Sequence, residues 1–228
     1  MIAHKKEFGL GFGMMVAFFV ILVLMFLPLI KGQNGLQYLD DLYNSISKGS
    51  AYYIPKVKEE AAPLADKQVQ VTLQMKDAQQ AEQTATLFMQ SGALVNVSDA
   101  TLQISGSLGN ILDNALDDAD KMYYNEGVAL TDKYGYNERQ VLYNWWTAFQ
   151  EMDKNLKSQK KFKEAKLIAF ASNKAVETSY NYYGIAPQSI TDKIGVVIFS
   201  LLFYVAYTLW YGFGIMFMFE GWGMQLAH

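Results

Sequence analysis

A long run without a charged side chain, Ile194 to Phe219, constrains this chain more than any other feature. A membrane-spanning helix needs about 20 apolar residues to cross roughly 30 Å of hydrocarbon, and this run is longer than that. A second run of the same character, Phe8 to Ile30, lies near the other end of the sequence. We therefore expect two transmembrane helices, with the polar residues between them forming one water-facing domain.

The first apolar run begins after Lys5 and Lys6, as a secretory signal does. Its length exceeds the usual apolar stretch of about 7 to 15 residues. No small-x-small cleavage site follows Leu29. We interpret the run as an uncleaved signal anchor. The two lysines favour a cytoplasmic N-terminus. This orientation predicts a two-pass protein of the plasma (inner) membrane, with both termini cytoplasmic and the central domain extracytoplasmic or periplasmic.

Both apolar runs carry glycines at spacings that allow two helices to approach closely. They are Gly9, Gly11 and Gly13 in the first run and Gly195, Gly212 and Gly214 in the second. Two interpretations stay open. Either the two spans of one chain pack on each other, or these residues pack against a foreign subunit.

The hydrophobic period changes between the spans. Gln68–Met75 alternates polar and apolar residues, which is typical of a half-buried strand. Asp77, with Gln80 three residues later, resembles a capping box at the start of a helix. Gly92 supplies the end of that helix. A strand followed by a helix is therefore predicted over this stretch.

The next elements are short. Val95 and Val97 predict a second strand, Leu102 and Ile104 predict a third, and helical spacing returns over Leu108–Ala119. This gives the order βαββα. A further strand at Val128–Thr131 would complete a ferredoxin-like βαββαβ unit.

Amphipathic helices flank this α/β unit. The spacing of apolar residues predicts helices within Gln33–Ala62, over Asn137–Leu156 and over Phe162–Tyr183. The first is interpreted as a stalk. The other two are expected to pair as a hairpin that leads into the second span.

The predicted fold class is therefore an α+β membrane protein: two transmembrane helices flank one extracytoplasmic domain, which combines the βαββα unit with amphipathic helices. The expected segments are a cytoplasmic tail 1–7, span 8–30, stalk 31–66, α/β unit 67–131, helical hairpin 132–192, span 193–219 and cytoplasmic tail 220–228. Two spans around an outward domain resemble the input half of bacterial membrane receptors. The βαββα order resembles small regulatory domains of the ACT or ferredoxin-like type. Neither resemblance supplies functional residues.

The composition excludes several kinds of chemistry. The chain has no cysteine, so disulfides, thiolate nucleophiles and Cys-ligated metals are excluded. Its two histidines, His4 and His228, lie at the ends and leave the central domain without an imidazole. The formal net charge of −3 offers no electrostatic footprint for nucleic acid. We assign no catalytic, cofactor-binding or metal-binding residue and expect no cofactor.

Two motifs contain residue types that occur in ligand-binding sites but lack the spacing that those sites require. The carboxylates Asp113, Asp117, Asp118 and Asp120 do not have the spacing of a calcium loop, and we interpret them as a solvated helix face. The turn Gly106–Gly109 lacks both the Rossmann and the P-loop spacing, and strand-to-helix turn geometry is the favoured explanation.

Aromatic side chains in the predicted domain are abundant, and such rings suit partner surfaces as well as helix packing. The candidates for helix packing or an interface are Gly9, Gly13, Gly195, Gly212, Gly214, Trp145, Trp146, Tyr182 and Tyr183.

These features predict a non-catalytic accessory or scaffold subunit of a larger integral-membrane complex. Its expected partners are other integral-membrane subunits and the lipid bilayer, without nucleic acid, and homo-oligomerisation stays open. The alternative is an extracytoplasmic ligand-sensing module that signals through a partner protein's membrane helices. An enzyme and an oligomeric channel rank below both, because no residue pair is singled out for catalysis and the spans carry no charge.

Overall fold

The computed structural model describes residues 2–224, and these form two compact units. The first unit combines Met1–Ile46 with Pro187–His228, and the second comprises Ser47–Ala186. The division falls inside helix α2 (Gly35–Ser50). Each unit is described by itself below.

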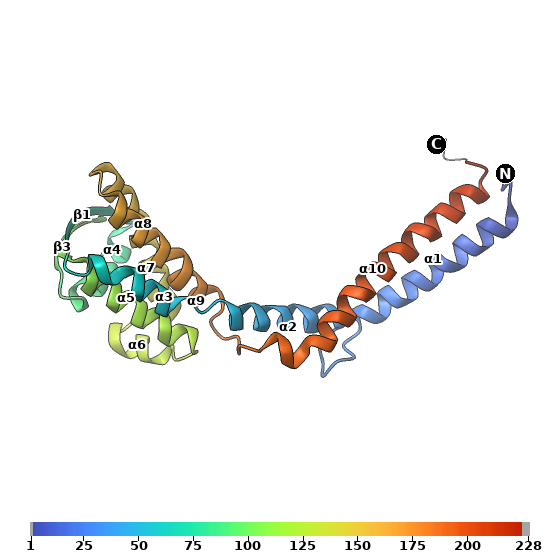
Figure 1. Cartoon of the computed structure of the whole chain (residues 1–228), viewed down its shortest axis with the longest axis horizontal. Coiled ribbons are helices and arrows are strands. Elements are labelled where there is room, and N and C mark those ends of the chain that lie inside the picture. The colour runs from blue at the N-terminus through green and yellow to red at the C-terminus, as the bar shows by residue number, and fades with distance from the viewer. Residues whose placement is uncertain (1, 225–228) are drawn as a thin grey trace. The chain divides into compact units, whose positions relative to one another are not determined.

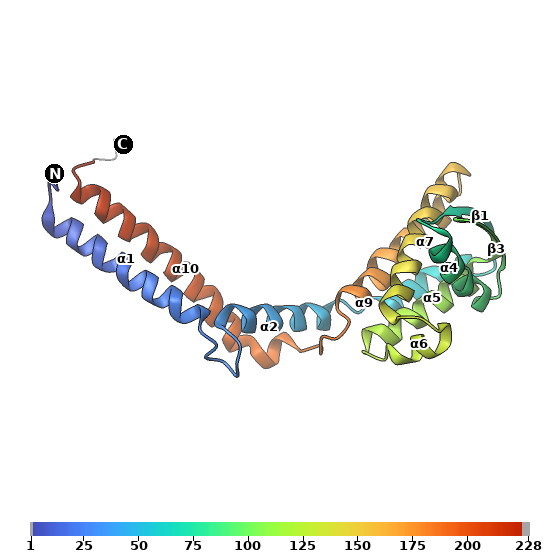
Figure 2. The same ribbon diagram turned by 180° about the vertical axis from the view of Figure 1, so that it is seen from behind.

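The first unit is built on two long helices, α1 (Lys5–Phe26) and α10 (Ile190–Gly221), which lie side by side in opposite directions (Figures 1 and 2). Both are long and apolar enough to cross a membrane. Gly11 is the only buried residue of α1. The apolar side chains of both helices are therefore largely exposed within the unit, unlike those of a core helix in a water-soluble protein.

The first apolar helix ends earlier than its apolar run predicts. α1 stops at Phe26, and Leu27 is extended with ψ 144°. Pro28 follows, and a residue before proline is disfavoured in the helical region. The second helix exceeds the predicted 193–219, because the Ser189 side chain accepts a hydrogen bond from the Thr191 N–H and starts α10 at Ile190.

The second unit contains a three-stranded antiparallel sheet. Its strands are β1 (Gln68–Gln74), β2 (Leu94–Ser98) and β3 (Thr101–Ser107), in the spatial order β1-β3-β2. Alternate residues of β1 are buried. Helix α4 (Ala78–Gln90) connects β1 to β2, and α5 (Leu108–Tyr123) follows β3. The βαββα order predicted from the sequence is therefore confirmed.

The predicted fourth strand is wrong. Residues of Val128–Thr131 belong to helix α6 (Val128–Tyr134), in which only Leu130 is buried. The outer edge of β1, where a fourth strand would pair, is met instead by side chains of α7 (Glu138–Ser158) and the residue that follows it. Asn155 Nδ2 donates to Thr72 O at 3.3 Å and Gln159 Nε2 to Gln70 O at 2.8 Å. A complete ferredoxin-like unit is therefore not formed.

Helices make up the rest of this unit. They are α3 (Ile54–Ala61), the short 3-10 turn η1 (Ala62–Leu64), α8 (Phe162–Ala171), the π-helical segment η2 (Ser172–Val176) and α9 (Glu177–Asn181). α7 packs on β1, α4 and α8, and its Trp145 lies in the core against Phe88 and Phe149 at ring distances of 5.2 and 5.5 Å. The second unit is therefore mixed and helix-dominant. Helices α4, α5 and α7 pack against its small sheet (Figure 1).

Candidate functional site

The two long helices of the first unit approach each other at glycines. A Cβ atom on Gly11 would lie 2.6 Å from Met218 N and 2.7 Å from Gly214 O, and one on Gly221 would lie 2.5 Å from Phe8 N. These neighbours are backbone atoms, which cannot move aside as a flexible side chain does. The close approach of α1 and α10 therefore requires glycine at these positions.

Polar side chains also connect the two helices. Tyr207 Oη donates a hydrogen bond to Phe18 O at 2.9 Å, and Trp210 Nε1 donates one to Met14 O at 3.1 Å. The Tyr207 and Phe18 rings stack at 4.2 Å. Both of these donors on α10 thus find a backbone acceptor on α1.

The predicted span glycines fall into two groups. Gly214 lies in the contact, with its Cβ position 3.0 Å from Met15 Sδ. At Gly9, Gly13, Gly195 and Gly212 an added Cβ would meet no atom within 4 Å, so the helix pair leaves their faces open. Gly11 and Gly221 carry the closest approaches; the glycine spacing of the first run included Gly11, whereas Gly221 was not predicted to take part in packing.

The four aromatic candidates of the second unit also differ in their surroundings. Trp145 is fully buried and packs between helices, so it is not presented to a partner. Trp146, Tyr182 and Tyr183 are half-buried. The Arg139 guanidinium lies 5.1 Å from the Tyr183 ring centre and also donates to Tyr183 O at 3.3 Å.

One carboxylate of the acidic helix is buried. Asp118 is fully buried, accepting hydrogen bonds from Lys133 Nζ at 2.7 Å, Tyr134 Oη at 2.6 Å and Trp145 Nε1 at 2.9 Å. The interpretation of this cluster as a solvated face is therefore wrong for Asp118. Helical spacing could have indicated that Asp118 is buried, because it follows the buried Ala115 by three residues and so lies on the same face of the helix. Burial, then the nearby Asp118 charge, raises the pKa of Tyr134.

The neighbouring carboxylates have separate partners. Asp117 pairs with Lys58 at 2.7 Å on the surface, and Asp120 accepts a hydrogen bond from Tyr52 Oη at 2.7 Å. Burial, then this hydrogen bond, raises the pKa of Tyr52. Among the described residues there is no group of three or more His, Cys, Asp or Glu side chains that could hold a metal ion.

The glycine turn before α5 has a structural explanation. The Leu108 and Gly109 amides donate to Lys67 O at 2.8 Å and Ala65 O at 3.1 Å, so neither is directed at an anion. A Cβ on Gly109 would lie 2.7 Å from Ala65 O. The favoured strand-to-helix explanation is consistent with these contacts.

A buried lysine joins the first and last segments of the second unit. Lys48 is fully buried, and its Nζ donates to Asn125 Oδ1 at 3.2 Å, Tyr182 O at 3.1 Å and Ile185 O at 2.6 Å. Tyr123 Oη donates to Lys48 O. Burial lowers the pKa of the Lys48 ammonium. Lys48 thus fixes α2's last turn to the segment that follows α9, a role that the sequence pattern did not indicate.

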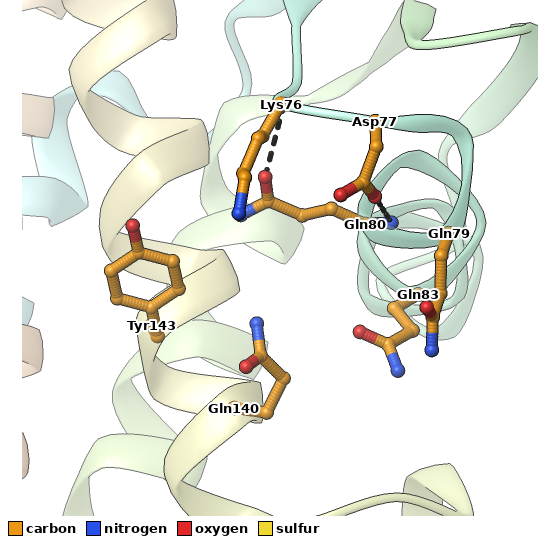
Figure 3. Close-up of a pocket in the computed structure, with 7 residues that line it drawn as sticks. All are labelled: Lys76, Asp77, Gln79, Gln80, Gln83, Gln140 and Tyr143. Carbon is orange, nitrogen blue, oxygen red and sulfur yellow. Dashed lines mark hydrogen bonds between the residues drawn. The ribbon is translucent and has the colours of Figure 1, made fainter.

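A polar surface pocket of about 250 Å³ lies between the start of α4 and α7 (Figure 3). Its lining residues are Lys76, Asp77, Gln79, Gln80, Gln83, Gln140 and Tyr143. Asp77 Oδ1 caps α4 by accepting from Gln80 N at 2.8 Å, and Gln80 Oε1 accepts from Lys76 N at 3.1 Å. The predicted capping box is thus present with its second hydrogen bond one residue earlier than in the usual pattern. Hydroxyl- or amide-rich ligands match such a lining.

Comparisons with known proteins do not assign the chain to a family: no protein-family model matches it, and neither a curated protein nor a solved structure does.

Proposed function

We propose that the chain is a non-catalytic accessory subunit of a larger integral-membrane complex. In this proposal α1 and α10 cross the bilayer, and residues 47–186 contact partner subunits outside the cytoplasm. The observation that carries the proposal is the division of the span glycines. Gly11, Gly214 and Gly221 suffice for the contact within the chain, whereas Gly9 and Gly13 face open space.

The exposed apolar surface supports the membrane part of this proposal. Leu10, Phe12, Val16 and Phe19 of α1 are all exposed, and water would oppose such a surface whereas lipid would not. In lipid, close association between helices depends on small residues, because lipid tails are as apolar as the helices themselves. An open Gly9 and Gly13 face is therefore suited to a further transmembrane helix.

The charges near α1 support the proposed orientation. Lys5 and Lys6 begin the helix, and positively charged residues at span ends favour the cytoplasmic side. An outward-facing second unit follows from this orientation. Cysteine scanning provides a direct check, because the chain has no native cysteine. A cysteine at Glu60, which is exposed in the second unit, should react with an impermeant maleimide added to intact cells.

Purification of the full chain in mild detergent tests the subunit proposal. We expect a stoichiometric partner in mass spectrometry, and a second copy of the chain would identify a homo-oligomer. The double variant Gly9→Ile/Gly13→Ile should lose the partner. The matched control, Phe19→Trp/Phe26→Trp, adds bulk to exposed positions on another side of the same helix and should retain it. Recovery of the wild-type chain as a lone monomer would contradict the proposal.

The polar pocket beside α4 favours a second candidate, a ligand-sensing module that acts through a partner's membrane helices. Several of its polar groups have no hydrogen bond among the described residues, including the side chain of Gln79 and the Tyr143 hydroxyl. A thermal-shift screen of polar ligands on the full chain tests it. A saturable rise in Tm favours sensing, because a ligand that binds only the folded state stabilises that state.

A further inference from the structure

A second pocket of the folded domain has a different chemical character. It has a volume of about 210 Å³, and its lining residues are Tyr143, Trp146, Glu177, Tyr180 and Asn181. Three aromatic rings from α7 and α9 therefore form most of the wall. The single charged group of the lining is the Glu177 carboxylate. Space for several water molecules is also space for a small organic group.

The rings present the electron-rich surface that attracts cations. Tyr143 and Trp146 lie three residues apart on α7, and their rings stack at 6.0 Å with planes 29° apart. The face of an aromatic ring attracts an ammonium or guanidinium group placed within about 6 Å of its centre. No lysine or arginine lines the pocket. Its chemistry is therefore complementary to a positive charge supplied from outside.

Glu177 adds a full negative charge to this wall. The residue is exposed, and no described side chain forms an ion pair or hydrogen bond with its carboxylate. The π-helical segment η2 ends immediately before it. A π-helical turn carries an extra residue and so rotates the residues that follow around the helix axis. Glu177 and Tyr180, three residues apart, then share one face of α9.

The neighbouring rings already hold a cation within the chain. The Arg139 guanidinium lies 5.9 Å from the Tyr180 ring centre and 5.1 Å from that of Tyr183. Arg139 does not line the pocket. The wall therefore includes a ring, that of Tyr180, which attracts a guanidinium group within this chain.

We propose that this pocket binds an alkylammonium or guanidinium group. Two sources present that chemistry: a Lys or Arg side chain of a partner subunit, and a free quaternary amine. The first source rests on the function proposed above. Binding of the cation itself does not, because it requires only the second unit of this chain.

The test titrates the full-length chain in detergent, without a partner, while following tryptophan fluorescence. Trp210→Phe and Trp222→Phe remove the indoles outside the second unit. The probes are tetramethylammonium chloride and the methylamide of N-acetyl-lysine, at ionic strength held constant with sodium chloride. We expect a saturable, millimolar response to at least one probe. A response to tetramethylammonium alone indicates a free amine, and a response to the lysine derivative alone indicates a side chain; both support cation binding.

Variants decide whether the response belongs to this pocket. Glu177→Gln should weaken binding about threefold to tenfold, and Tyr143→Leu by a similar factor, as expected from losing one charge or one ring. Glu60→Gln makes the same charge change on an exposed face of α3 and should bind like the wild type. Absence of a saturable response, or pocket variants that titrate like the wild type, would overturn the proposal. Either result would leave the subunit proposal to its own test by purification.

Discussion

The two units of the chain are stabilised in different ways. The helix pair buries almost no side chains, and its two helices approach closely because glycines lie at the contact. Tyr207 and Trp210 also donate hydrogen bonds to backbone carbonyls of α1. The second unit has a continuous apolar core, and its buried polar groups meet other side chains, as at Asp118. The comparison teaches that a pair of apolar helices depends on shape and backbone acceptors, whereas a domain with an apolar core tolerates a buried charge where hydrogen bonds surround that charge.

The largest expected effect concerns the buried charge. Asp118→Ala leaves Lys133, Tyr134 and Trp145 without their shared acceptor, and breaking a buried pair in this way typically costs about 3–5 kcal/mol. Urea unfolding of the full chain, followed by fluorescence of the tryptophans in the second unit, measures this loss. The neighbouring variant Asp117→Ala removes only an exposed ion pair with Lys58 and should cost under about 1 kcal/mol. Equal losses in the two variants would remove the distinction between buried and exposed carboxylates.

The next effect concerns the helix pair. Gly11→Val places side-chain atoms where Met218 N and Gly214 O lie, and overpacking of this kind costs about 1–3 kcal/mol. Cysteines introduced at Phe18 and Tyr207, whose rings stack, should then cross-link several-fold less with a short bifunctional reagent. Gly13→Val adds the same side chain two residues further along α1, in open space, and should leave the yield unchanged. Similar yields for both variants would show that the glycines do not determine the contact.

Titration at high pH should affect the second unit through its tyrosines. Burial raises the pKa of Tyr136 to about 12, and burial beside Asp118 also raises that of Tyr134. A group whose pKa is higher in the folded state contributes stability below its unfolded pKa, and this stability is lost as pH rises toward the folded value. Above about pH 10 each of these tyrosines should therefore lower the unfolding free energy by up to about 1.4 kcal/mol per pH unit.

Urea midpoints at several pH values, with absorbance at 295 nm to count ionised tyrosines, measure this effect. Lys48 acts in the opposite direction, since burial lowers its pKa below the ordinary 10.5. Its contribution to stability rises with pH and is complete near that value. Above it, Lys58, whose pKa is raised by its hydrogen bond to Asp117, adds to the loss caused by the tyrosines. Tyr136→Phe should reduce the loss at high pH. A midpoint that is constant from about pH 10 to about pH 12 would contradict the assignment.

Periodicity predicted the fold where one face of an element is buried. Val69, Val71 and Leu73 alternate and are all buried in β1. It failed at Val128–Thr131, because a four-residue stretch does not distinguish a strand from a helix, and the structure buries Leu130 alone. The replacement of a fourth strand by Asn155 and Gln159 depends on amides far away in the sequence. No local pattern contains that information.

The candidate sites also depend on contacts between residues that lie far apart in the sequence, which local patterns do not predict. Glycine spacing identified Gly9, Gly11 and Gly13 together but not which of them lies in the contact, because that depends on how the two helices are rotated against each other. Glu177 lines the pocket with Tyr180 directly after a π-helical segment, which helical spacing in the sequence did not indicate. Lys48 has three oxygen partners, two of which lie more than 130 residues away. Charged residues are usually exposed, so the sequence alone favoured an exposed Lys48 over the buried one that the structure shows.

The smallest expected effect tests whether local signals contribute to the second unit beyond its core. Asp77→Ala removes the side-chain acceptor for the Gln80 amide at the start of α4 and should cost about 1 kcal/mol, whereas Asp77→Asn keeps an acceptor and should cost less. Urea unfolding of both variants at neutral pH gives the difference. If the two variants lose equal stability, the carboxylate charge near the helix start would be responsible and the hydrogen bond would not. If neither loses stability, the core alone positions α4, and the second unit would resemble the helix pair in depending on packing rather than on caps.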